Sequence, residues 1–270
     1  MGRIKLNLDG TAKSLYTEQG KVIEVGTGSD FPYNTLDEAY AAASAGDTIL
    51  IYPGTYLATY IGSSKPVHWL GVDKHSCIIY NPYGDKAQSC FNLCGGSTVR
   101  NLTVKFTCED PISTEGATAY RGYCIHADHS SMEDNEITIE DCILLNKYFS
   151  CIGVGLYQDA SVYIKNCYCE EQADNPIESI REHGAIYAHG NSAENITGQF
   201  ISIQNCYAKS HSNYSLRVDV TSQSGSVQKV EFINNTCVSG DLGVADNSIK
   251  TTAGAKLNTC HGNNVAALNS

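Results

Sequence analysis

Five short segments of the sequence alternate aliphatic residues with side chains that can do chemistry. The first position of this pattern holds His126, Gly153, Tyr187, Arg217 and Lys250, and the second, two residues later, holds Asp128, Gly155, His189, Asp219 and Thr252. An imidazole beside a carboxylate can act as an oriented acid/base pair. Guanidinium and ammonium groups bind anions and stabilise negative charge that develops during a reaction. These residue types therefore indicate proton transfer next to an anion-binding group.

We predict two groups of site residues from these positions. The catalytic group consists of Asp128, His189, Asp219 and Arg217, in which His189 and Asp219 form the acid/base pair and Asp128 is a second carboxylate across from it. The substrate-binding group consists of His126, Tyr187, Lys250, Arg181, Gly153 and Gly155. The two glycines carry no side chain, so they would open a depression in the middle of the group.

Strands are the elements that would bring these positions together, because the side chains of a strand alternate between its two faces. The aliphatic neighbours would point inward and the reactive side chains outward to solvent: Ile125, Ile152, Ile186, Leu216 and Ile249 form the inward set. Two insertions, residues 109–121 and 170–183, flank this face, and the second ends in Arg181, Glu182 and His183. Converging polar groups are typical of a ligand cleft. Charged pairs that serve only solubility and cross-strand attraction are the alternative interpretation.

A second repeated phrase predicts how these strands are connected. An aliphatic or aromatic residue and a variable residue precede Asn or Asp at residues 99–102, 139–142, 164–167, 203–206 and 232–235. Asn and Asp tolerate the left-handed backbone conformation that a sharp corner between strands requires. Two strands and one such corner per repeat are typical of a solenoid coil, in which Cys142, Cys167 and Cys206 would stack in the interior as free thiols. We therefore predict an all-β solenoid.

The N-terminal part of the chain predicts a cap for this solenoid. Residues 21–25 predict a strand, and Asn34 is the expected N-cap of a helix over residues 34–45, which Gly46 ends. The apolar face of this helix consists of Leu36, Ala39, Tyr40 and Ala43. A helix in this place would cover the open end of the stacked strands. The strands expected to follow are residues 48–52 and about 56–61.

The predicted organisation is an N-terminal arm and one structural domain. The arm comprises residues 1–20, and the domain spans 21–270, with the cap at 21–46, the coils at about 47–254 and a C-terminal tail at 255–270. The tail has little apolar material with which to cover the last coil. This favours a homo-oligomer, for example a trimer, formed through the C-terminal end.

Composition and charge argue against several classes of protein. The net charge of −11 argues against a nucleic-acid partner, which needs a basic surface. No apolar run is long enough to span a membrane. Residues 1–15 are polar and basic and have no apolar signal core, so we expect no signal peptide. The expected location is the cytoplasm as synthesised, with a place on a virion or release by a non-Sec route as the alternatives.

Twelve cysteines in a chain without a signal peptide predict reduced thiols rather than disulfides. The pairs Cys90/Cys94 and Cys167/Cys169 lack a matched partner pair at zinc-site spacing, so no metal site is expected. No cofactor is expected, and no sequence motif supports Ca2+.

The sequence around the predicted cap resembles that of pectin lyase-like β-helix proteins, including pectinesterases. The resemblance rests on residues 25–39 (VGTGSDFPYNTLDEA) and 45–56 (AGDTILIYPGTY), continues through 65–71 and 77–79, and extends along the Asn corners to about residue 240. It implies a single-stranded, right-handed parallel β-helix with an N-terminal capping α-helix. It also implies a carbohydrate ligand, because the superfamily contains polysaccharide lyases, glycoside hydrolases, epimerases and phage tailspike domains.

The catalytic motifs of pectinesterases are absent from the sequence. Gln158-Asp159 matches the start of a Gln-Asp-Thr-Leu motif but continues as Ala-Ser, and Asp-Phe-Ile-Phe-Gly and Arg-Pro-Trp do not occur. Pectinesterase activity is therefore not expected. The leading hypothesis is a polysaccharide lyase or glycoside hydrolase with a groove on the outer face of the helix. The alternative is a non-catalytic module that binds glycans or builds a phage tail or capsid fibre.

Overall fold

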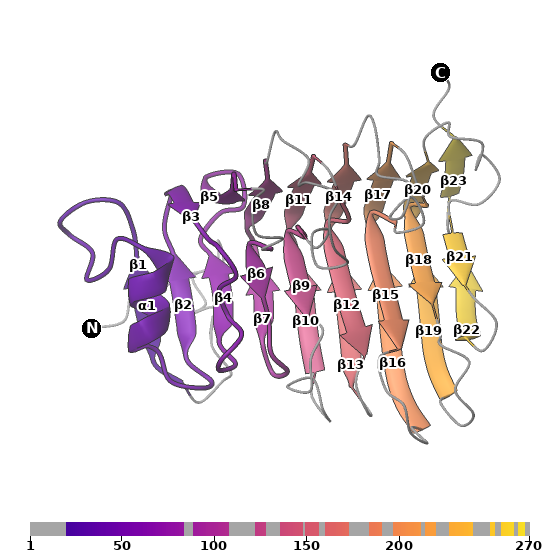
Figure 1. The fold of residues 1–270 in the computed structure, drawn as a ribbon, viewed down its shortest axis with the longest axis horizontal. Helices are drawn as coiled ribbons and strands as arrows, with labels where there is room; N and C mark the ends of the chain where they lie inside the picture. The colour runs from indigo at the N-terminus through magenta and orange to yellow at the C-terminus, as the bar shows by residue number, and fades with distance from the viewer. Residues whose placement is uncertain are drawn as a thin grey trace, which may run out of the picture.

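The strands of the chain stack into three parallel sheets that run the length of an elongated molecule (Figure 1). The structure, a computed structural model, describes residues 20–83, 89–107, 122–127, 136–147, 149–156, 160–172, 184–190, 197–211, 214–219, 227–239, 249–251, 255–261 and 264–267. The expected N-terminal arm lies outside these residues, apart from Gly20. Within them, no helix has the length and hydrophobicity that crossing a membrane requires.

The first sheet has nine strands, each parallel to its neighbours. Their order is β1 (Val22–Val25), β2 (Thr48–Ile51), β4 (His68–Gly71), β7 (Thr98–Arg100), β10 (Glu136–Glu140), β13 (Ser161–Lys165), β16 (Thr197–Gln204), β19 (Val227–Ile233) and β22 (Ala255–His261).

The second sheet has eight parallel strands and the third has six. The second consists of β3 (Gly54–Leu57), β5 (Cys77–Asn81), β8 (Thr103–Phe106), β11 (Ile143–Asn146), β14 (Tyr168–Glu171), β17 (Tyr207–Ser210), β20 (Thr236–Ser239) and β23 (Asn264–Ala267). The third consists of β6 (Phe91–Asn92), β9 (Ile125–Ala127), β12 (Ile152–Leu156), β15 (Ile186–Gly190), β18 (Leu216–Asp219) and β21 (Ile249–Thr251). A typical coil takes one strand from the third sheet, then one from the first, then one from the second, so the chain forms a parallel β-helix.

Residues 255–270, which were expected to form a tail, contain β22 and β23. These strands pair in parallel with β19 and β20 and so continue the first and second sheets. The coils therefore extend beyond residue 254.

The corner between the first and second sheets is made by the predicted Asn and Asp residues. Asn101, Asp141, Asn166, Asn205 and Asn234 all have positive φ angles, between 52° and 56°. This left-handed conformation costs other L-residues free energy, but Asn and Asp adopt it more readily because their short side chains bond locally. Asn205 Nδ2 donates to Asn166 Oδ1 at 3.3 Å, so part of the column is a hydrogen-bonded ladder.

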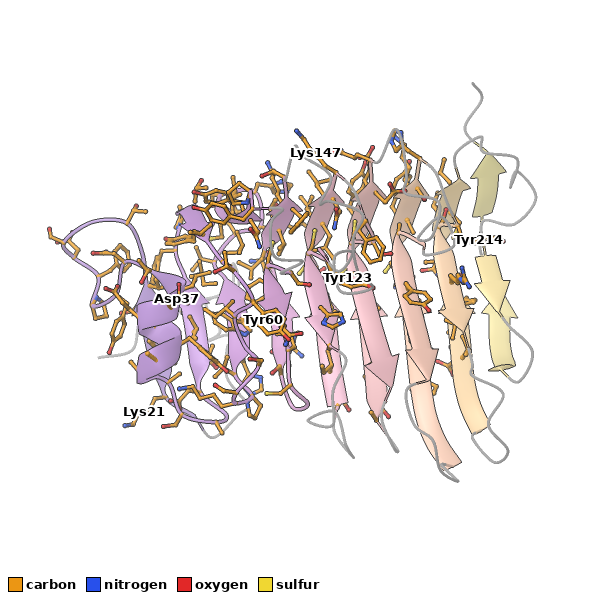
Figure 2. The ribbon with its side chains drawn as sticks, in the orientation of Figure 1. Lys21, Asp37, Tyr60, Tyr123, Lys147 and Tyr214 are labelled. Carbon is orange, nitrogen blue, oxygen red and sulfur yellow. The ribbon has the colours of Figure 1, made fainter. Side chains whose placement is uncertain are left out.

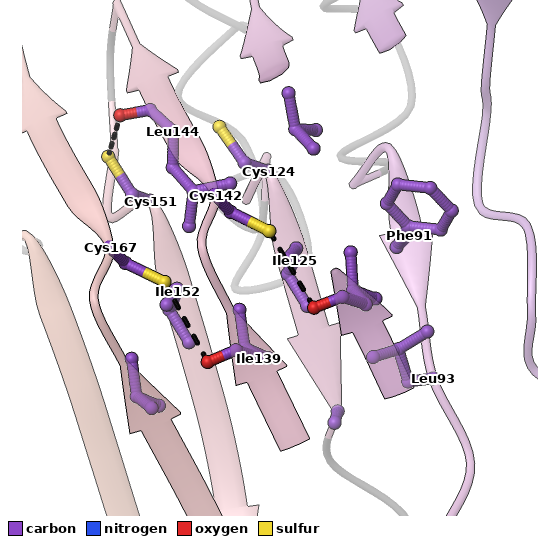
Figure 3. Packing of buried hydrophobic residues seen from close by; sticks show 14 of the residues in the cluster. Phe91, Leu93, Cys124, Ile125, Ile139, Cys142, Leu144, Cys151, Ile152 and Cys167 are labelled. Atoms are coloured by element: carbon purple, nitrogen blue, oxygen red, sulfur yellow. Dashed lines mark hydrogen bonds between the residues drawn. The ribbon is translucent and has the colours of Figure 1, made fainter. Parts of the chain in front are cut away.

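Cysteines fill the interior beside this corner. Cys142, Cys167 and Cys206 are buried at equivalent places in successive coils, and each Sγ donates to backbone carbonyl oxygens, as Figure 3 shows for Cys142 and Cys167. The predicted stack of free thiols is confirmed at these positions. Burial raises the pKa of Cys167 far above its usual range, so this thiol stays protonated at neutral pH.

The N-terminal cap contains helix α1 (Leu36–Ala42), which lies at one end of the stack (Figure 1). Its N-cap is Thr35 rather than the predicted Asn34. The backbone N–H of Glu38 donates to the Thr35 hydroxyl oxygen, and the Glu38 carboxylate accepts a hydrogen bond from the backbone N–H of Thr35. The helix also ends earlier than predicted, with Ala43 as its C-cap. Leu36 and Ala39 are fully buried in the common core, and burying a side chain such as Leu36 contributes about 1.5–3 kcal/mol.

Candidate functional site on the third sheet

The third sheet carries the predicted reactive positions in one column. Its parallel register pairs Asn92 with His126, His126 with Gly153, Gly153 with Tyr187, Tyr187 with Arg217, and Arg217 with Lys250. The second predicted column is also in register, because Gly155 pairs with His189 and His189 with Asp219. The predicted alignment of the coils is therefore confirmed.

The inward set of aliphatic residues is also confirmed wherever its side chains are described. Ile125, Ile152, Ile186 and Leu216 are fully buried in the hydrophobic core. Because side chains alternate along a strand, the column between them lies on the opposite face. We call this surface, made of Asn92, His126, Gly153, Tyr187 and Arg217, the third-sheet outer face.

We had predicted that the side chains on this face point outward to solvent, but they are largely covered. His126 and Arg217 expose only 6% and 7% of their surface, and Tyr187 is half-buried. Aromatic side chains cause part of this burial. They belong to Tyr123 and Tyr214, which precede the strands and are labelled beside the third sheet in Figure 2.

His126 is fixed by two neighbours. Its Nδ1 lies 2.7 Å from Oδ1 of Asn92, which is fully buried one coil earlier. The ring of Tyr123 lies almost parallel to the imidazole, with 4.9 Å between the ring centroids and 13° between the planes. Phe149 packs edge-on against Tyr123 at 4.6 Å and holds that ring in place. This imidazole is therefore oriented before any ligand arrives.

The expectation that Gly153 opens a depression is corrected by this arrangement. A Cβ atom on Gly153 would lie 2.2 Å from a ring carbon of Tyr123, so the space above this glycine is filled by the tyrosine ring. Glycine is required here for close packing, not for a hollow. Gly155 is buried in the next outward position of the same strand.

Arg217 lies close to two tyrosines at the other end of the face. Its Cζ is 5.7 Å from the ring centroid of Tyr187 and 5.8 Å from that of Tyr214. Each contact of this kind is worth roughly 0.5–2 kcal/mol, more where water is excluded. The guanidinium is thus held beside two aromatic rings, an arrangement that suits a ligand with both apolar ring faces and acceptor oxygens.

The remaining predicted site residues can be placed only in part. The strand backbones put His189, Asp219 and Lys250 in the two columns, but their side chains lie outside the described part of the structure. Asp128 and Arg181 lie outside the described residues altogether, as do Glu182 and His183. Their catalytic and binding roles stay predictions.

Sequence reasoning missed one residue of the face, Asn92, and two that pack against it, Tyr123 and Tyr214, although the sequence contains a signal for all three. Asn92 occupies the same column one coil before His126. Tyr123 and Tyr214 each stand three residues before a member of the column, His126 and Arg217 respectively. Because a tyrosine occurs three residues before the column in two coils, the sequence alone could have placed both tyrosines at the same edge of the sheet.

A second polar cluster lies on the outer face of the second sheet. Glu170 binds Lys209 at 2.8 Å and His211 at 3.2 Å, and Tyr168 donates its hydroxyl to Glu170 at 2.7 Å. The rings of Tyr168 and Tyr207 stack at 4.9 Å with 1° between their planes, so each covers one face of the other. The charges of this cluster satisfy one another, which is typical of a structural network.

The described residues contain no group of three or more His, Cys, Asp or Glu side chains arranged to hold a metal ion.

The comparisons with known proteins identify the fold. No protein-family model and no curated protein sequence matches the chain significantly. Among solved structures, the pectin methylesterase PemA from Erwinia chrysanthemi aligns with a TM-score of 0.57 and 15% identity, over 82% of this chain and 67% of that one. A pectin methylesterase from carrot aligns at 0.47 and 18% identity, over 93% and 89% of the two chains. A PL6 family alginate lyase aligns at 0.48 and 13% identity, over 97% of this chain and 40% of its own.

The class that these features define is a right-handed parallel β-helix, the fold that the sequence predicted and that the aligned pectin methylesterase shares. Such low identities show the fold and leave the reaction to be argued from the residues of the outer face.

Proposed function

We propose that this protein is an enzyme that acts on a carbohydrate polymer bound along the third-sheet outer face. The observation that supports this best is Arg217, which lies close to the rings of Tyr187 and Tyr214 in the same column as the oriented His126. Aromatic rings stack on sugar faces, and a guanidinium binds carboxylates or other oxygen-rich groups in pairs of hydrogen bonds. The fold adds support, since the structure aligned at a TM-score of 0.57 is a pectin methylesterase.

The shape of the face favours a polymer over a small molecule. Its side chains come from successive coils, which follow one another at about 4.8 Å along the helix. From Asn92 to Arg217 the column crosses five paired strands, β6, β9, β12, β15 and β18. A linear chain of sugars lying along the column would meet one coil after another. We expect the reaction to be elimination or hydrolysis of the polymer, since the motifs of pectinesterases are missing from the sequence.

A panel of polymers tests the proposal. Polygalacturonate, methyl-esterified pectin, alginate and dextran are each assayed for binding and for shortened or unsaturated products. We expect product from at least one acidic polymer, because Arg217 supplies a positive charge. Binding without product from any polymer, across pH values and added metal ions, would favour the non-catalytic glycan-binding alternative.

Variants of the face locate the binding site. Arg217→Lys keeps the charge but loses the planar pair of donors, and we expect KM for the acidic polymer to rise about 10–100-fold, which corresponds to losing one charge-assisted bond. The matched control is Arg100→Lys on the outer face of the first sheet, where Arg100 pairs with Glu140 at 3.3 Å. Equal effects of both variants on KM would contradict a site on the third sheet.

A further inference from the structure

Tyr60 differs from the residues at the equivalent position of the other coils. Ile61 pairs in parallel with Phe91, so the chain at residues 60–62 extends the third sheet by one coil towards the N-terminal cap. In this coil the backbone N–H of Tyr60 donates to the carbonyl oxygen of Ser89 at 2.7 Å. Tyr60 exposes 41% of its surface. The residues that directly precede the inward position in the next five coils are instead small and fully buried: Cys90, Cys124, Cys151, Ala185 and Ser215.

The backbone at Tyr60 is strained. Its φ angle is 60°, in the left-handed region, which costs free energy for a residue with a Cβ atom and is rare for a bulky one. Among the described residues at this position of the coils, Tyr60 alone has a positive φ. The five buried residues show that a coil closes without this conformation, so the strain belongs to the tyrosine and not to the fold. Strained backbone of this kind is concentrated at ligand-binding sites, where the surrounding structure holds it in place.

The Tyr60 ring is also available to a ligand. Within the described part of the chain, the side chain of Tyr60 makes no hydrogen bond and no ring contact. Tyr123 and Tyr214, which precede their strands at the same edge of the third sheet (Figure 2), are instead engaged with His126 and Arg217. Tyr60 thus provides an accessible ring at the cap end of a face whose other described aromatic rings are less exposed.

From these observations we propose that Tyr60 is a sugar-binding residue, whose ring stacks on one unit of the carbohydrate polymer at the cap end of the third-sheet outer face. The inference rests on the proposed function and adds a contact to it. Sugar rings have apolar C–H faces, and an exposed aromatic ring covers such a face without needing a pocket. Tyr60 lies five coils before Arg217, about 24 Å at the usual spacing of neighbouring strands. Tyr60 and Arg217 therefore bind different units of one polymer, which suits a long linear chain.

Thermal unfolding of two variants of the full chain tests the strain without a polymer. Tyr60→Gly and Tyr60→Ala both remove the ring, but only glycine adopts a φ of 60° freely. We expect Tyr60→Gly to have a Tm about 2–4 °C above that of Tyr60→Ala, which is the shift that relief of one left-handed residue produces in a chain of this size. A Tm for Tyr60→Gly equal to or below that of Tyr60→Ala would show that residue 60 is not strained and would overturn this part of the argument.

Calorimetric titration with polygalacturonate, methyl-esterified pectin, alginate and dextran tests the binding role. For each polymer that the wild type binds, we expect Kd to rise about 3–10-fold in both Tyr60→Gly and Tyr60→Ala, as loss of one aromatic contact predicts. Tyr60→Phe keeps the ring and should stay within about twofold of the wild type. The rise should be the same at low and high salt, because stacking is not screened by ions, whereas the effect of Arg217→Lys should shrink. Weaker binding by both variants, although Tyr60→Gly is the more stable of the two, would separate loss of the ring from loss of the fold.

The matched control is Tyr168→Ala, which removes an exposed tyrosine from the outer face of the second sheet and should leave Kd unchanged. An equal rise of Kd in this control would overturn the role of Tyr60. Unchanged Kd in Tyr60→Gly and Tyr60→Ala, with weaker binding in Arg217→Lys, would also overturn it, while the proposed function stands. Absence of both binding and product with the wild type on all four polymers would overturn the proposed function and this inference with it.

Discussion

At the scale of single residues, the two outer polar clusters differ in how their charges are used. Glu170 on the second sheet has three described partners, Lys209, His211 and Tyr168, all within hydrogen-bonding distance. Arg217 on the third sheet lies close to two aromatic rings, with its Cζ 5.7 Å from the centroid of Tyr187 and 5.8 Å from that of Tyr214. A carboxylate surrounded by donors is stabilised in place. A guanidinium beside aromatic rings is attracted to their faces by the cation–π interaction.

The Glu170 network predicts a pH effect on folding stability. Burial alone would raise the pKa of Glu170, but hydrogen bonds from Lys209, Tyr168 and His211 outweigh it and lower the pKa to about 2. A folded pKa below the unfolded value near 4.5 means that this stabilisation is complete above pH 4.5 and is lost as the pH falls towards 2. We expect it to be roughly 1–2 kcal/mol, reduced by partial exposure to solvent.

Denaturant unfolding of the wild type and Glu170→Gln at several pH values between 6 and 2 measures this contribution. The difference in unfolding free energy should be largest at pH 6 and shrink below pH 4.5. Glu140→Gln is the matched control on the first sheet, where Glu140 pairs with Arg100 at 3.3 Å and both side chains are more exposed than those of Glu170 and Lys209. A Glu170→Gln difference that stays constant across the pH range would contradict the lowered pKa.

At the scale of elements, each coil depends on its corner. Asn166 has a φ of 55° and accepts a hydrogen bond from Asn205 in the next coil. Its two roles, adopting the left-handed conformation and extending the ladder, can be separated by substitution. Glycine keeps the backbone freedom but lacks the side-chain acceptor, whereas alanine lacks both.

We expect Asn166→Ala to destabilise the fold by about 1–2 kcal/mol more than Asn166→Gly does, because the left-handed conformation is strained for alanine. The free energy of unfolding in urea gives both values. The ladder bond itself should account for roughly 0.5–1.5 kcal/mol of the loss in Asn166→Gly. Equal destabilisation by glycine and alanine would show that the conformation of the corner contributes little.

How far the elements could be predicted depends on how often their signals recur. The corners and the third-sheet column each recur in five segments. An alignment shifted by one residue would have placed an entire set of aliphatic side chains on the solvent face, so the recurrence fixes the register. The boundary of α1 occurs only once, and Asn34 and Thr35 are both good N-cap residues. The choice falls to Thr35 because Asn34 Nδ2 donates to the carbonyl oxygens of Gly26 and Gly28, a contact between loop residues that no local rule specifies.

The burial of the site could not be predicted for a related reason. Alternation along a strand says which face a side chain is on, but not what lies above that face. Tyr123 belongs to the segment before its strand and folds back over the neighbouring coil at Gly153. The sequence therefore predicted a depression at Gly153 and Gly155. In the fold, Gly153 instead makes room for the ring of Tyr123.

At the scale of the whole molecule, one continuous core joins the coils from the N-terminal cap to β20. The cluster of buried hydrophobic residues runs from Val25 and α1 to Cys237. Cysteines form part of this core in several columns, including Cys90, Cys124 and Cys151 before the third sheet and Cys169 in the second. Burial raises the pKa of Cys151 and Cys169 well above the usual range of a thiol. For these two thiols, exposure and ionisation, the two conditions for reactivity, are thus both unmet in the folded state.

Thiol reactivity should therefore report on opening of the β-helix. We expect the folded chain at pH 8 to react slowly with an aromatic disulfide reagent, and the denatured chain, never treated with reductant, to yield close to twelve thiols. Because a buried thiol reacts only after its coil opens, Asn166→Ala, which weakens one corner, should speed the reaction of the folded chain. Asn166→Gly should do so less. Far fewer than twelve thiols after denaturation would mean that disulfides form, and fast reaction of the folded wild type would mean that the thiols are not held in the core. The order of reaction rates, alanine variant above glycine variant above wild type, would link the strain of a single corner to the stability of the stack around it.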